Sequence, residues 1–178
     1  MDRRRLVGAG AGAIAAMAIP VAMRAQDDGG PGEIVAGGGA VETPLGLVDF
    51  GFVARVDGAG KVTGSFAVRD FTQPGNPVVL QSTQLNRMEA LAGDSSNARQ
   101  IVGWVSAPGA TVLFVLEVDD VDGPGSGKDV FRLRVGEAAS SLLEGEEQRA
   151  CDCADYSYAV EGPVVQGDIL VVADQVVA

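Results

Sequence analysis

Hydrophobic and polar residues alternate along most of the chain, and this period of two predicts β-strands rather than helices. The clearest example runs from Ala110 to Val135, where two alternating stretches flank an acidic, glycine-rich segment. The register that matches their apolar faces pairs Phe114 with Val135, Leu116 with Leu133, and Val118 with Phe131. The same register places Glu117 across from Arg132. A slip of one residue would turn Arg132 and Arg134 onto the apolar face, so the alternation of apolar and charged residues selects this register.

A second hairpin is predicted between Leu45 and Asp70, around a turn at residues 57–60. Matching its apolar faces places Phe52 opposite Phe66. The opposite faces then bring Asp49 across from Arg69, a charge pair that agrees with this register. Two independent features therefore select one pairing.

The remaining strands are predicted at residues 34–41, 78–91, 98–107, 156–160 and 168–172. The end of the second of these, from residue 85, also has a composition compatible with a helix. Residues 137–149 are rich in Ala, Leu and Glu and are interpreted as a long loop with a turn or two of helix. Eight to nine strands with short connections indicate an all-β fold, a single antiparallel meander that closes into a small barrel. A two-sheet β-sandwich is the alternative.

The first 25 residues have the composition of a cleaved export signal peptide: a basic start, an apolar stretch rich in small residues, and an abrupt change to Gln26-Asp27-Asp28. Arg3-Arg4-Arg5 is twin-arginine-like, although Asp2 stands where Ser or Thr is usual. A general secretory signal is the alternative route. We therefore expect a signal at 1–25, a flexible leader at 26–33 and one β domain at 34–178, exported to the periplasm or the extracellular space.

Charge and composition narrow the function classes. The formal net charge is −11, and removing residues 1–25 leaves 9 basic and 23 acidic residues, a net charge of −14. Such a chain repels nucleic acid and anionic membrane surfaces, so neither is an expected partner, and no membrane span is expected after signal removal. The chain contains no histidine, which removes Ser-His-Asp catalysis and most catalytic zinc sites.

The acidic segment between the two strands of the first hairpin is the one candidate metal site. It contains Asp119, Asp120, Asp122 and Asp129 among glycines and Pro124, and hard cations such as calcium bind several oxygen ligands from a loop of this kind. The spacing does not fit an EF-hand, and Lys128 opposes a cation. A solvated turn, in which the aspartates bind their own backbone, is the competing interpretation. No other cofactor is expected.

Cys151 and Cys153 are the only cysteines and form the candidate disulfide. A bridge between residues two apart closes an awkwardly small ring, so a strained or redox-active bridge, a soft-metal site and cross-links between chains stay open as alternatives. Paired carboxylates for glycoside hydrolysis have no distinguishing pattern among so many acids, and no catalytic residue is predicted.

Four short glycine-containing segments follow one another along the chain: Gly37-Gly38-Gly39, Phe50-Gly51-Phe52, the hairpin from Asp120 to Phe131, and Gly162 to Ile169. Their order resembles that of the bacterial post-COAP domain. Lys128, Gly123 and the segment 137–153 depart from the family pattern. The resemblance implies a small secreted bacterial β domain without an established activity, and it supplies no catalytic residue.

These observations predict an exported, acidic β-barrel or sandwich domain with a non-enzymatic structural or binding role, whose partner is an unknown protein or a small apolar ligand. A barrel that binds or converts a small molecule in an apolar cavity is the alternative function. A calcium-stabilised surface module is a further alternative. The structural or binding domain predicts an interior filled by side chains. The small-molecule barrel predicts a cavity lined by Phe and Val.

Overall fold

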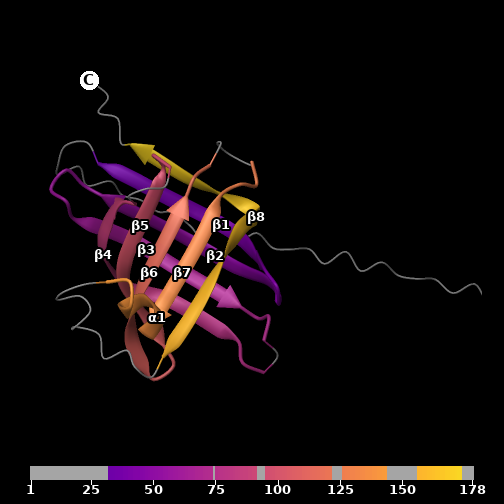
Figure 1. Cartoon of the computed structure of the whole chain (residues 1–178). Coiled ribbons are helices and arrows are strands. Elements are labelled where there is room, and N and C mark those ends of the chain that lie inside the picture. Colours follow the sequence, from indigo (N-terminus) through magenta and orange to yellow (C-terminus); the bar gives the residue numbers. More distant parts are fainter. Residues whose placement is uncertain (1–31, 74, 92–94, 122–125, 144–155, 174–178) are drawn as a thin grey trace, which may run out of the picture.

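The computed structural model describes residues 32–73, 75–91, 95–121, 126–143 and 156–173. Within them, eight antiparallel strands follow one another in chain order and close into one barrel, in which the last strand pairs with the first (Figure 1). The strands are β1 (Glu33–Thr43), β2 (Gly46–Val56), β3 (Val62–Asp70), β4 (Val78–Ala90), β5 (Ala98–Ala107), β6 (Ala110–Asp119), β7 (Val130–Gly136) and β8 (Ser157–Ala173). The predicted closed meander is confirmed.

Both predicted hairpin registers are confirmed. In the β6–β7 hairpin Leu116 lies opposite Leu133 and Glu117 lies opposite Arg132. In the β2–β3 hairpin Phe52 lies opposite Phe66, and Asp49 lies opposite Arg69. The alternation of apolar and charged residues therefore specifies the pairing, because any slip would reverse the two faces.

The C-terminal part of the chain differs from the prediction of two strands. β8 is one continuous strand that changes partner, pairing with β7 through Pro163 and with β1 from Val164 onward. A register shift in the β1–β8 ladder lies at this change, because Val165 of β8 has no counterpart on β1. The glycines of this region allow close approach rather than turns. Gly39 and Gly167 face each other, and a Cβ on Gly167 would lie 1.9 Å from the Gly38 carbonyl oxygen.

Two smaller predictions concern helical segments. The stretch from residue 85 continues as part of β4 through Ala90, so its helical alternative is wrong. The region after β7 forms one short helix, α1 (Glu137–Ser140), which packs against β6, β7 and β8 with Ala139 fully buried. No helix in the described part of the chain is long and apolar enough to cross a membrane.

The barrel interior is packed with phenylalanine side chains. The rings of Phe50 and Phe131 have centroids 4.3 Å apart, and those of Phe66 and Phe114 have centroids 5.0 Å apart. All four side chains are buried, with at most 7% of their surface exposed. These contacts join strands that are distant in the sequence, β2 with β7 and β3 with β6. They add aromatic stabilisation to the hydrophobic effect.

Candidate functional site

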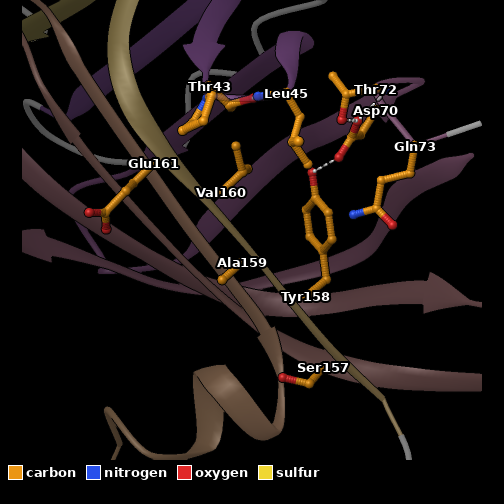
Figure 2. A pocket seen from close by; sticks show the side chains of 11 residues that line it. Thr43, Leu45, Asp70, Thr72, Gln73, Ser157, Tyr158, Ala159, Val160 and Glu161 are labelled. Carbon is orange, nitrogen blue, oxygen red and sulfur yellow. Dashed lines mark hydrogen bonds between the residues drawn. The ribbon is translucent and has the colours of Figure 1, made fainter.

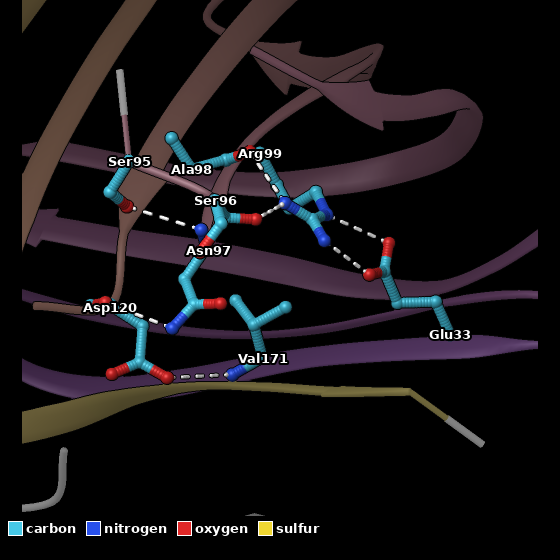
Figure 3. Close-up of polar contacts among 8 residues, drawn as sticks. All are labelled: Glu33, Ser95, Ser96, Asn97, Ala98, Arg99, Asp120 and Val171. Carbon is cyan, nitrogen blue, oxygen red and sulfur yellow. Dashed lines mark hydrogen bonds and ion pairs between the residues drawn. The ribbon is translucent and has the colours of Figure 1, made fainter. Parts of the chain in front are cut away.

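The acidic segment that was the candidate calcium site lies beside the C-terminal half of β8. This half of β8 pairs with β1 along one edge, and past the end of the β7–β8 ladder no strand pairs with its other edge, where Asp120 and Asp129 lie. The Asp129 carboxylate accepts hydrogen bonds from the backbone N–H groups of Val121, at 3.1 Å, and Ile169, at 2.8 Å. The Asp120 carboxylate accepts one from the N–H of Val171, at 3.1 Å (Figure 3). Two aspartates thus take the place of a strand in satisfying the edge of β8.

The other members of the predicted calcium set are Asp119 and Asp122. Asp119 instead accepts a hydrogen bond from the Ser95 hydroxyl, and Asp122 lies outside the described residues. No three Asp, Glu, Cys or His side chains in the described part of the chain are grouped as a metal site would require. Asp120 and Asp129 are 7% and 1% exposed, so they are buried acceptors of backbone hydrogen bonds rather than groups of a solvated turn. The calcium site itself stays a prediction.

Asp168, in β8, belongs to the same polar cluster. Its carboxyl group interacts with that of Asp129, and this interaction favours the protonated form of Asp129. Burial, and then the neighbouring Asp168, raise the pKa of Asp129, while the hydrogen bonds from Ile169 and Val121 act in the opposite direction. The net direction is a raised pKa.

This raised pKa predicts a pH dependence of stability that Asp168→Asn reduces. A carboxyl group whose pKa is higher in the folded protein contributes stability below its unfolded pKa, and that contribution is lost as pH rises through the folded pKa. An amide at position 168 removes a negative charge and can donate to the Asp129 carboxylate. We therefore expect urea unfolding to show Asp168→Asn more stable than the wild type at pH 7, by about 1 kcal/mol. The gain should shrink towards pH 4.

The matched control for this experiment is Asp49→Asn, which removes one negative charge from an exposed position on β2. Surface substitutions of this kind change stability by about 0.5 kcal/mol or less. If Asp168→Asn and Asp49→Asn gave the same pH profile, the interaction between Asp129 and Asp168 would not contribute to stability.

The barrel end where β5 begins is bridged by an ion pair. Arg99 of β5 donates through Nε to Glu33 of β1 at 2.8 Å, and its Nη2 donates to the second carboxylate oxygen at 2.5 Å. The Nη1 atom donates to the carbonyl oxygens of Ser96 and Ala98, both at 2.8 Å (Figure 3). Glu33 raises the pKa of Arg99. This bidentate ion pair, in which all three guanidinium nitrogens of Arg99 donate hydrogen bonds, holds β1 and β5 together at this end of the barrel.

The opposite end of the barrel carries an open depression of about 440 Å³ (Figure 2). The β1–β2 turn, the end of β3 and the start of β8 form it, through Thr43, Pro44, Leu45, Asp70, Thr72, Gln73 and residues 157–161. Asp70 is 6% exposed and accepts hydrogen bonds from the Thr72 N–H at 2.8 Å, the Thr72 hydroxyl at 2.6 Å and the Tyr158 hydroxyl at 3.1 Å. A buried carboxylate and a half-buried phenol therefore meet at this depression.

The environment of the Tyr158 phenol makes it a poor candidate for acid–base chemistry. Burial, and then the charge and hydrogen bond of Asp70, raise the pKa of Tyr158 far above its usual range. The phenol consequently stays protonated and donates its hydrogen to Asp70. A group that neither gains nor loses a proton near neutral pH is a poor general acid or base.

Sequence reasoning did not identify this depression as a site. In the sequence, Asp70 only ends the second predicted hairpin, and Tyr158 lies in the strand predicted at residues 156–160. The two residues are 88 positions apart, and only closure of the barrel between β8 and β1 brings them together. Cys151 and Cys153 lie outside the described residues, so their disulfide stays a prediction.

No family model matches the chain. No curated protein and no solved structure is significantly similar to it. The fold and the polar contacts described above are therefore the basis for the functional argument.

Proposed function

We propose that this chain is an exported, non-enzymatic β-barrel domain with a binding or structural role, whose contact surface is an end of the barrel. The observation that carries the proposal is the occupied interior, in which Phe50 packs on Phe131 and Phe66 packs on Phe114. An apolar-ligand carrier needs that volume for its ligand. The acidic loop supports the same proposal, since Asp120 and Asp129 bind the backbone of β8.

Export rests on the composition of residues 1–25, which lie outside the described residues. A twin-arginine-like signal followed by an acidic leader supports a periplasmic or extracellular location. The relation to the post-COAP domain stays a prediction from the order of the glycine motifs, and it favours the same compartment and fold.

A titration with the neutral apolar dye N-phenyl-1-naphthylamine tests the proposal. We expect no saturable rise in dye fluorescence at micromolar protein, because phenylalanine side chains pack against one another in the interior that the dye would occupy. A hollow eight-stranded barrel that binds the dye is the positive control. One saturable site per chain would overturn the proposal in favour of the barrel with an apolar cavity.

A further inference from the structure

We propose that the depression between the β1–β2 turn and the start of β8 binds a small amphipathic amine, with its ammonium group at Asp70 and its apolar part against Leu45. This inference rests on the proposed binding role and names the chemical class of its ligand. The depression holds about 440 Å³, within the range of pockets that take small organic molecules. Backbone segments of three different strands form its wall, which fixes the relative positions of the groups.

Asp70 gives the depression its preference for a cation. The hydrogen-bond donors that the structure places on its carboxylate belong to Thr72 and Tyr158, and all of them are neutral. A carboxylate has about four acceptor positions, and three are filled by these donors. One position is therefore left for a further donor, and an ammonium group forms the strongest hydrogen bond with a buried carboxylate.

The rest of the wall adds no positive charge. The residues that line the depression include two acids and no lysine or arginine. The second acid, Glu161, is paired with Arg134 on the outer surface, which leaves Asp70 as the charge that faces a ligand (Figure 2). The formal net charge of −11 on the whole chain adds to this preference, since it attracts cations and repels anions.

An apolar residue at the rim accounts for the second half of the ligand. Leu45, in the β1–β2 turn, is 66% exposed, the largest exposed fraction among the large hydrophobic side chains of the described residues. It lines the depression together with Pro44 and Val160. An exposed leucine beside a buried carboxylate matches a molecule with an ammonium group at one end and an apolar group at the other, since burial of the leucine adds hydrophobic stabilisation.

Titration with phenethylamine, followed by backbone amide chemical shifts of the full domain, tests the inference. We expect saturable shifts confined to residues 43–45, 70–73 and 157–161, with a Kd of about 1 mM, as suits a ligand of this size. The neutral analogue 2-phenylethanol should bind at least about tenfold more weakly, because it lacks the charge that interacts with Asp70. Equal shifts from both compounds, or shifts outside these residues, would overturn the inference.

Variants separate a specific site from a general charge effect. Asp70→Asn should weaken phenethylamine at least about tenfold and leave 2-phenylethanol unchanged. Because Asp70 also holds Thr72, Leu45→Ala tests the site without removing a buried group, and it should weaken the binding of both compounds by about three- to tenfold. Leu47→Ala, which alters an exposed leucine that does not line the depression, is the matched control. Equal effects of the two leucine variants would overturn the inference.

This experiment also separates the two proposals. Failure of phenethylamine to bind, together with no binding of N-phenyl-1-naphthylamine, would overturn the amine site and leave the non-enzymatic domain standing. Binding of the apolar dye would overturn the proposed function, whatever the result with the amine.

Discussion

Replacing Phe131 with alanine should lower the free energy of unfolding by about 3–5 kcal/mol. The side chain of Phe131 is 0% exposed and lies against Phe50, with ring centroids 4.3 Å apart. Alanine removes most of that buried apolar volume and the aromatic contact, and the closed barrel limits how far its neighbours can relax into the gap. Urea denaturation followed by circular dichroism measures the change.

Phe71→Ala is the matched control for this substitution. Phe71 follows β3 and is 63% exposed, so its truncation should change stability by about 0.5 kcal/mol or less. A loss of less than 1 kcal/mol for Phe131→Ala would mean that the interior is loosely packed. A barrel with an apolar ligand cavity would then fit the measurement better than a barrel filled by phenylalanine side chains.

The strand registers were predictable because the buried face and the exposed face of each hairpin select the same pairing. In the β6–β7 hairpin the buried residues select one pairing, and the pair of Glu117 and Arg132 on the other face selects the same one. Agreement between two faces of a strand rejects a slip of one residue. The closed meander followed from the same local signals, since almost every connection is of hairpin length.

The course of β8 was not predictable in the same way. Gly162, Pro163 and Gly167 are typical of turns, yet in this barrel they lie within one strand at the point where its partner changes from β7 to β1. The need for glycine at position 167 comes from the backbone of β1, which lies too close for a Cβ. That neighbour is far away in the sequence, so no local pattern identifies it.

The hydrogen bonds of Asp120 and Asp129 were also not predictable, because their partners are far away in the sequence. The sequence places Asp120 and Asp129 together in one acidic loop, which is typical of a cation site or a solvated turn. Their partners Val171 and Ile169 are 51 and 40 positions further along the chain. The structure therefore gives these carboxylates a role in holding the last strand, which the composition of the loop does not indicate.

Asp129→Ala is expected to destabilise the domain by about 2–5 kcal/mol, because it leaves the N–H groups of Val121 and Ile169 without an acceptor beside the last strand. Hydrogen exchange should locate the effect. The amide of Ile169 should lose protection, whereas the amides of the β2–β3 hairpin should lose protection only to the extent that global stability falls.

Asp57→Ala is the matched control, because Asp57 also accepts hydrogen bonds from two backbone N–H groups, those of Ala59 at 3.0 Å and Lys61 at 2.8 Å. Those two bonds lie in an exposed turn, where water replaces a lost acceptor, so the substitution should cost about 1 kcal/mol or less. The two variants remove the same number of hydrogen bonds and differ in burial. Equal losses would show that the carboxylate at the edge of β8 acts as an ordinary turn residue, whereas a larger loss for Asp129 would establish it as a buried acceptor that holds the last strand in place.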